Sequence, residues 1–196
     1  MNYEITAIET AYNGINFRSR LEARWAAMFD LLKWDWTYEP IDFNGWIPDF
    51  AIHGEQIVYV EVKPVVEFPI EVAQKIDASG CVDQVLIVGI YGPTLSDYHN
   101  VEIGWLRETW GDPGVTTLEP EFSWDTAPMG RWKGTESMGR RKNDNRIGFC
   151  HGSGSYTDRI TGHYDGGGFG NGGLKGNEVV LLWREACNRT RWNAKK

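Results

Sequence analysis

Two acids and a lysine between Trp46 and Pro64 are the residues of this chain best suited to chemistry. The segment has the pattern of two short strands joined by a turn at His53–Gly54. Asp49 ends the first strand and the pair Glu61 and Lys63 ends the second, so the three groups meet if the strands pair. Two carboxylates that share a divalent cation, with an amine beside them, suit metal-assisted hydrolysis of a phosphodiester.

The second of these strands, predicted over Gln56–Lys63, alternates residue by residue. Strand side chains point to opposite faces with a period of two. One face is therefore expected to pack in the core, while the other presents a carboxylate and an amine side by side. The expected core face carries Val58, Val60 and Val62, and the opposite face carries Ile57, Tyr59, Glu61 and Lys63.

A third acid, Glu22, lies on a predicted helix. Residues 17–32, FRSRLEARWAAMFDLL, have apolar side chains at helical spacing, which predicts an amphipathic helix from about Ser19 to Lys33. Glu22 falls near the edge of the buried stripe, from which its carboxylate could reach a metal over the sheet edge. It also follows Ser19 by three residues, the pattern of a capping box. A catalytic role and a capping role both fit this position.

Four short motifs, FRSRLE, YEP, PDF and EVK in that order, resemble the PD-(D/E)xK nuclease superfamily. Within it, the chain is most similar to phage endonuclease I type Holliday-junction resolvases and to small phage-encoded nucleases that begin with a similar FRSxLE helix. The resemblance covers roughly residues 15–90 and leaves the last hundred residues unmatched. One departure is Pro64 after Lys63, where relatives often have glycine.

The resemblance implies a restriction-endonuclease-like sandwich that cleaves DNA with Mg²⁺, for which Mn²⁺ can substitute. It implies Glu22, Asp49, Glu61 and Lys63 as the catalytic residues. The metal ligands would be Asp49, Glu61, the Val62 carbonyl and, for a second ion or its water, Glu22. It also implies a phage origin and action in the host cytoplasm. A resolvase would be a homodimer, because two symmetric cuts need two sites.

Composition narrows the class of protein. A chain of 196 residues suggests one domain with elaborations. No apolar run approaches the length of a membrane span, and the N-terminus lacks the pattern of a signal peptide. The cysteines are few, odd in number and scattered, which favours reduced thiols in a cytoplasm. They are Cys81, Cys150 and Cys187.

Charge is distributed unevenly along the chain. Residues 34–130 hold three basic and seventeen acidic side chains, whereas residues 131–196 hold thirteen basic and six acidic ones. An acidic sheet region repels a polyanion unless metal neutralises it, whereas a basic C-terminal third could hold a phosphate backbone. The alternative is that the acids solvate a surface and the basic residues a tail.

The remaining patterns predict an α/β fold with a mixed central sheet flanked by helices and a glycine-rich basic C-terminal extension. A helix over 68–79 and an apolar strand over 82–90 follow the 56–63 strand, so the two strands are expected to be parallel. We expect a nuclease core over residues 1–107, an aromatic linker over 108–129, a basic glycine-rich DNA-contacting module or loop over 130–176, and a C-terminal helix over 177–196.

The basic residues of the last third, with an aromatic and flexible glycines among them, suit backbone contact and base stacking. A loop with incidental charge, and a closing helix with a solvated face, are the alternatives. Cys150, His151 and His163 do not form a four-ligand set at zinc spacing, so no structural zinc is expected. The predicted DNA-binding residues are Arg18, Arg131, Trp132, Lys133, Arg140, Arg141, Lys142, Arg146, Arg189 and Arg191.

Two other function classes stay open on the sequence alone. A catalytically silent protein on a nuclease fold, such as a phage accessory protein or inhibitor, would engage a host protein, and the acidic middle third would suit such a partner. The presence of all four implied catalytic residues argues against a silent protein, since a nuclease that has lost its activity usually lacks a carboxylate or the lysine. An RNA nuclease would share the same metal chemistry.

Overall fold

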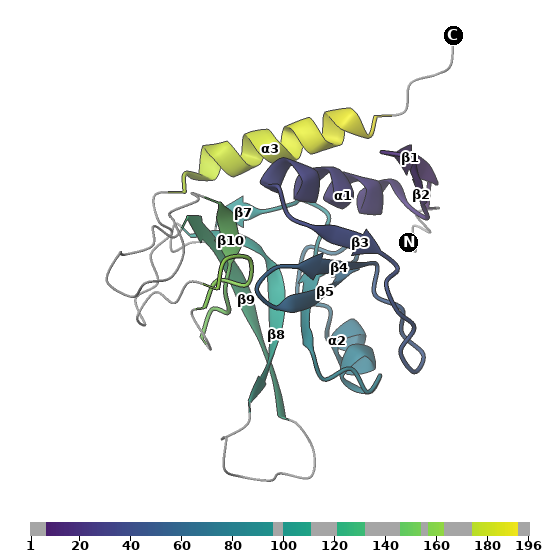
Figure 1. Ribbon diagram of the computed structural model, residues 1–196, viewed down its shortest axis with the longest axis vertical. Helices are drawn as coiled ribbons and strands as arrows, with labels where there is room; N and C mark the ends of the chain where they lie inside the picture. Colours follow the sequence, from purple (N-terminus) through teal and green to yellow (C-terminus); the bar gives the residue numbers. More distant parts are fainter. Residues whose placement is uncertain are drawn as a thin grey trace.

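The computed structural model describes residues 7–95, 100–110, 121–131, 146–153, 157–162 and 174–191. Within these residues the chain is an α/β protein with one mixed, curled sheet of eight strands, a separate two-stranded sheet and three helices (Figure 1). The elements in chain order are β1 (Thr10–Tyr12), β2 (Ile15–Phe17), α1 (Arg20–Leu32), β3 (Trp36–Tyr38), β4 (Phe50–His53), β5 (Ile57–Val62), α2 (Ile70–Asp77), β6 (Gln84–Val88), β7 (Thr94–Leu95), β8 (Val101–Trp110), β9 (Glu121–Arg131), β10 (Ile147–Phe149) and α3 (Gly176–Arg189).

The order of strands across the large sheet is β10-β9-β8-β6-β5-β4-β3, and β7 pairs with β8. Strands β5 and β6 are parallel, as the sequence predicts, and α2 lies on the crossover between them. The β4–β5 hairpin is antiparallel, which confirms the predicted pairing of the two strands that carry the acids. The sheet extends beyond β6 because β8, β9 and β10 add to that edge in turn.

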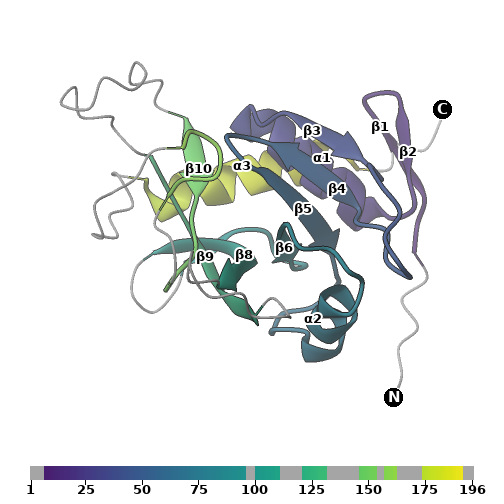
Figure 2. The same cartoon turned by 60° about the horizontal axis from the view of Figure 1, so that its bottom comes forward.

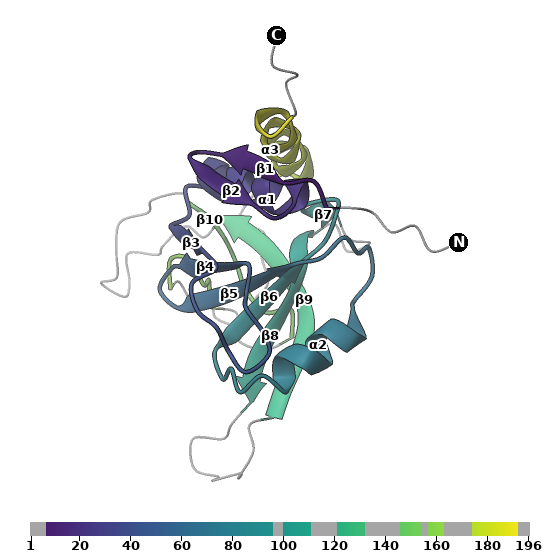
Figure 3. The same cartoon turned by 90° about the vertical axis from the view of Figure 1, so that its right-hand side faces the viewer.

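Helices cover both faces of the sheet (Figures 2 and 3). Helix α1 packs its buried Trp25 and Phe29 over the face that carries Val58 and Val60, so the predicted valine face is confirmed as core. Helix α3 lies along the outer side of α1, where Trp183 packs on Trp25 with ring centroids 4.7 Å apart. Helix α2 covers the opposite face with side chains that include Ala73 and Ile76, packed with Val85 and Ile87.

The predicted aromatic linker over residues 108–129 is corrected by the structure. Instead, β8 and β9 form a long antiparallel pair in which Glu108 is opposite Ser123. Trp105 and Trp124 pack on Phe68, with ring centroids 5.9 and 5.8 Å away. The prediction failed because the breaker residues that suggested a linker fall in 111–120, outside the described residues, while the flanking residues pair and pack.

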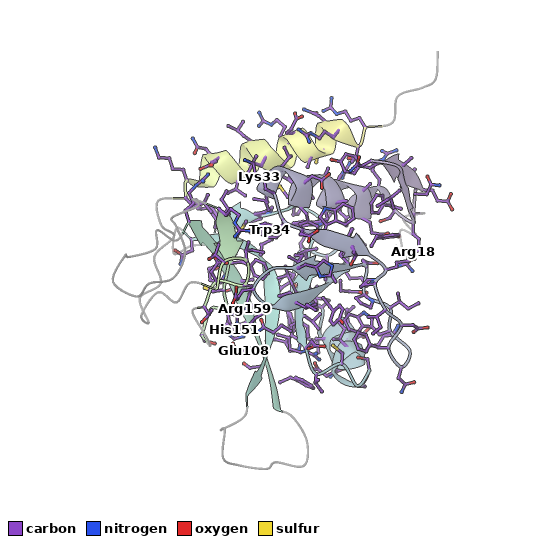
Figure 4. All side chains as sticks on the ribbon, in the orientation of Figure 1. Arg18, Lys33, Trp34, Glu108, His151 and Arg159 are labelled. Carbon is purple, nitrogen blue, oxygen red and sulfur yellow. The ribbon has the colours of Figure 1, made fainter. Side chains whose placement is uncertain are left out.

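The described part of the predicted basic module is built into the sheet. Strand β10 pairs with β9 at the sheet edge. Residues 157–162 pack on the β4–β5 turn, where the Glu55 N–H donates to the Arg159 carbonyl at 3.0 Å. Arg159 is buried and pairs with Glu108 at 2.9 Å, beside His151 (Figure 4). Of the helices described, none is long and apolar enough to cross a membrane.

Candidate active site

The acids predicted to be catalytic meet where β4 begins and β5 ends. Asp49 directly precedes β4, so the prediction that it ends a strand is corrected by the structure. Glu61 is the fifth residue of β5, and Lys63 follows that strand. Because Phe50 is paired with Val60, Asp49 lies beside Glu61 on the neighbouring strand. The hairpin therefore brings together three groups whose spacing along the chain is 12 and 2 residues.

Each of the two strand acids is held by a backbone or indole N–H and by a cation. The Val62 N–H donates to Asp49 Oδ2 at 2.7 Å, and Arg18 Nη2 donates to Asp49 Oδ1 at 2.8 Å. Trp46 Nε1 donates to Glu61 Oε2 at 2.8 Å. The ammonium group of Lys63 forms an ion pair with Glu61 Oε1. Val62, predicted to offer its carbonyl to a metal, thus contributes its N–H to the adjoining acid.

Glu22 is capped by Ser19 at the start of α1, and its carboxylate also joins this site. Ser19 is the N-cap of α1, and its Oγ accepts the Glu22 N–H at 3.1 Å and donates to Glu22 Oε1 at 2.7 Å. The Tyr38 hydroxyl donates to Glu22 Oε2 at 2.6 Å. Burial, and then the hydrogen bond to Glu22, raise the pKa of Tyr38 to about 12, which keeps it a donor at neutral pH. The contact expected of a helix cap is therefore present, and the catalytic role of Glu22 stays a prediction.

Replacing Ser19 by alanine is expected to lower the free energy of unfolding by about 1 kcal/mol, because an N-terminal N–H of α1 loses its acceptor. Urea denaturation measures this change. Ser153→Ala, at an exposed position away from any helix end, is the control and should change stability by less than about 0.5 kcal/mol. Equal stability of Ser19→Ala and the unmodified protein would contradict the capping role.

The electrostatics of the site are dominated by clustered negative charge. Asp49, Glu61 and Glu22 are only 4%, 5% and 7% exposed. Burial first, and then the charges of Glu61 and Glu22, raise the pKa of Asp49 from its ordinary value to about 7. The Val62 N–H and Lys63 act in the opposite direction. The other three predicted catalytic groups thus all act on Asp49, and the site carries an excess of buried carboxylate that a cation would relieve.

The donor set fits a hard divalent cation that keeps part of its water shell. Among the described residues, no three His, Cys, Asp or Glu side chains stand ready around one point to hold a metal ion. Mg²⁺ does not require such a cage, since one or two carboxylates with waters and substrate phosphates suffice. Asp49 and Glu61 supply the two carboxylates, and their outer oxygens now bind Arg18 and Lys63. An ion at Asp49 would have to displace Arg18.

The predicted DNA-binding arginines separate into two groups. Arg18 lies at the acids, at the right-hand side of Figure 4. Arg131 pairs with Glu178 of α3, and Arg189 pairs with Glu185 on the same helix. Arg131 stands on β9, three strands from β5 across the sheet, or about 14 Å at the usual strand spacing. These two arginines are thus engaged with acids of the chain, and Arg131 lies away from the predicted catalytic groups.

The structure also describes Arg146 and Arg191, two other residues predicted to bind DNA. The charge of Arg146 acts on the buried Asp158, lowering its pKa against the larger effect of burial, which raises it to about 6. Arg191 is exposed directly after α3. The prediction for Trp132, Lys133, Arg140, Arg141 and Lys142 lies outside the described residues.

Three polar residues around the acids were not predicted from the sequence. Trp46 binds Glu61, Tyr38 binds Glu22, and Glu39 binds Arg18 through Oε1 to Nε at 2.9 Å. Two of them belong to the YEP motif, which carried part of the family resemblance without an assigned role. Trp46 belongs to none of the four motifs. A tryptophan near a strand usually packs in the core, so the sequence did not indicate that its indole N–H would bind an acid.

Comparison with protein-family models, with curated proteins and with solved structures found no match to this chain. The likeness to the nuclease superfamily therefore rests on the residues of the four motifs. In the structure, polar side chains from FRSRLE, YEP, PDF and EVK form one contiguous network.

Proposed function

We propose that this chain is a Mg²⁺-dependent endonuclease that hydrolyses phosphodiester bonds in DNA. The observation that carries the proposal is the convergence of Glu22, Asp49, Glu61 and Lys63 at one end of the β4–β5 hairpin. Three buried carboxylates beside a half-buried lysine serve no packing purpose, because burying like charges costs stability. Such an arrangement is typical of a site that binds a cation and an anionic substrate.

In this proposal each residue has a defined task. Asp49 and Glu61 hold the cation, and Glu22 holds a second ion or its water. A bound Mg²⁺ would polarise the scissile phosphate and make a water more acidic. Lys63 leaves Glu61 to donate to the attacking water or to the phosphate oxygen, where charge develops. Because Lys63 directly follows the β5 strand, its ammonium group stays within reach of both acids.

The proposal extends to the fold and the biological setting. A mixed sheet with α1 on one face and α2 on the other, and with the acids on an antiparallel hairpin beside a parallel strand, supports a restriction-endonuclease-like sandwich. A phage origin, action in a host cytoplasm, a homodimer and a preference for branched DNA follow from the motif likeness and remain proposals. Residues 34–130 carry a net negative charge, and a bound cation would reduce the repulsion between this site and a polyanion.

The test is cleavage of a four-way DNA junction and of linear duplex of the same sequence, with Mg²⁺, Mn²⁺ or EDTA. We expect cutting only with a divalent cation, and stronger cutting of the junction would identify a resolvase. Size-exclusion chromatography with light scattering tests the homodimer. Cutting of RNA in place of DNA would favour the RNA nuclease. No cutting in any metal would overturn the proposal and favour a nuclease-like protein that binds a host protein.

Trp46→Phe is expected to lower Mn²⁺ affinity and cleavage about 10- to 100-fold, because the ring remains but Glu61 loses the donor that orients it. Isothermal titration with Mn²⁺ and single-turnover cleavage measure the two effects. Trp36→Phe is the matched control, since Trp36 Nε1 donates to Asp30 at 2.9 Å, away from the site. Equal losses in both variants would indicate a general effect of removing an indole N–H.

A further inference from the structure

We propose that Arg18 is a phosphate-binding residue whose release is coupled to divalent-cation binding. Without a cation it rests on Asp49, and when an ion takes that carboxylate it turns to the substrate phosphate. This inference rests on the proposed function, because it requires a cation at Asp49 and a phosphodiester in front of it. Arg18 is held from two sides, by Asp49 and by Glu39.

The first step of the argument is competition for one oxygen. Asp49 Oδ2 already accepts the Val62 N–H at 2.7 Å, so Oδ1 is the oxygen without a backbone partner. Arg18 Nη2 lies 2.8 Å from that same Oδ1. A guanidinium and a divalent cation cannot share it, because their charges repel at this distance. Binding of either one therefore weakens binding of the other, and the coupling is reciprocal.

The second step is that Arg18, once displaced, remains at the site. Its Nε pairs with Glu39 Oε1 at 2.9 Å, and its side chain is 57% exposed. Glu39 has φ of 45°, a left-handed backbone that is costly for a non-glycine residue in front of a proline. The Glu39 N–H donates to the Asp49 carbonyl at 2.9 Å, which ties this conformation to the catalytic strand. Glu39 is thus a tether that holds Arg18 at the site independently of Asp49, together with Tyr38, which also hydrogen-bonds the Arg18 side chain.

The third step is the balance of charge. Three buried carboxylates face two cations, Lys63 and Arg18, so the resting site has a negative excess that keeps Arg18 inward. Glu39, which also pairs with Arg18, adds a fourth carboxylate, so a divalent ion cancels the excess. Arg18 is then no longer drawn to Asp49, and its guanidinium fork matches two phosphate oxygens.

The test compares Arg18→Ala with the unmodified protein in Mn²⁺ titrations without DNA. We expect about threefold to tenfold tighter Mn²⁺ binding by Arg18→Ala, because the competing guanidinium is gone. Arg189→Ala is the matched control, since Arg189 also pairs with a carboxylate, Glu185, at 3.0 Å on an exposed helix. Arg189→Ala should leave Mn²⁺ affinity unchanged. Equal or weaker Mn²⁺ binding by Arg18→Ala would overturn the inference.

A second measurement tests the phosphate contact separately. A fluorescent duplex is bound in EDTA and in Ca²⁺, which takes the same oxygen ligands as Mg²⁺. Arg18→Ala should bind the duplex about as well as the unmodified protein in EDTA, and about threefold to tenfold more weakly in Ca²⁺. Arg18→Lys should give intermediate values in both assays, because a single ammonium cannot bridge two acids. If Arg18→Ala folds poorly, Arg18→Lys replaces it as the test variant. A loss of equal size in EDTA and Ca²⁺ would overturn the coupling.

The two readouts separate this inference from the proposed function. If the unmodified protein cuts DNA but Arg18→Ala binds Mn²⁺ no more tightly, the nuclease stands and the role of Arg18 is wrong. If Mn²⁺ binding tightens and the duplex is bound in a Ca²⁺-dependent way without cutting in any metal, Arg18 acts as proposed and the nuclease is wrong.

Discussion

Replacement of Lys63 by alanine is expected to reduce DNA cleavage about 10²- to 10³-fold, the effect of removing one preorganised group that stabilises charge in a transition state. Lys63 is the ammonium group paired with a catalytic carboxylate, and its side chain is 35% exposed, so it can reach both Glu61 and a substrate. Single-turnover cleavage under saturating protein measures the chemical step. DNA affinity should change much less, because one lysine contributes little to the total backbone contact.

Lys75→Ala is the matched control for that experiment. Lys75 is an exposed lysine on α2, a helix that follows the same strand. Its removal should leave the cleavage rate within about twofold, since exposed single charges have small effects. Cleavage by Lys63→Ala at the rate of Lys75→Ala would exclude Lys63 from the chemistry, whereas equal losses in both variants would indicate a general charge effect on DNA binding.

Asp49→Asn is expected to abolish cleavage and, at the same time, to stabilise the protein. The carboxylate is needed to hold the cation, but in its absence the buried charge beside Glu61 and Glu22 is unfavourable. The asparagine carbonyl keeps the acceptor for the Val62 N–H. The free energy of unfolding at pH 8 should rise by about 1–3 kcal/mol, the order that a raised carboxyl pKa implies. Chemical denaturation measures it.

The pH dependence of this effect has a defined sign. Burial, Glu61 and Glu22 raise the folded-state pKa of Asp49 from 3.8 to about 7. Its stabilising contribution is therefore complete below pH 3.8 and is lost as the pH rises through about 7. The gain from Asp49→Asn should accordingly be largest at pH 8 and disappear near pH 4. Added Mg²⁺ should stabilise the unmodified protein but not the variant.

Asp42→Asn, at an exposed position in the same loop, is the control for Asp49→Asn and should change stability by less than about 0.5 kcal/mol at every pH. A destabilised Asp49→Asn at pH 8 would show that the ion pair with Arg18 outweighs the repulsion among the acids. That result would leave the cleavage prediction intact, since the two measurements depend on different properties of the carboxylate.

Stability and activity thus oppose each other at this site. The acids that repel one another in the resting protein are the groups that a cation requires. Two cations of the chain, Arg18 and Lys63, limit the cost until the metal arrives. The same residues therefore explain how the fold tolerates the site and how the site would accept a metal and a phosphate.

Local periodicity was enough to predict the elements that carry the acids. The alternation from Ile57 to Val62 placed three valines in the core and Glu61 on the other face, because strand side chains alternate whatever their surroundings. The helical spacing after Ser19 similarly predicted α1 and its buried face. The order of strand, helix and strand predicted that β5 and β6 are parallel, since crossovers of that length allow little else.

Only the tertiary structure decided which side chains complete the site. Trp46, Arg18 and Glu39 reach the acids from a loop, a helix start and a strained turn, and no local period links such positions to their partners. The β8–β9 pair escaped prediction for a related reason, since its strands are specified by packing on Phe68 and by pairing with β6. Residues 15–90 of the sequence thus carried the prediction of the chemistry, because the acids lie on or beside elements with regular local patterns. Their hydrogen-bonded surroundings depend on contacts between residues distant in the chain, which only the folded structure brings together.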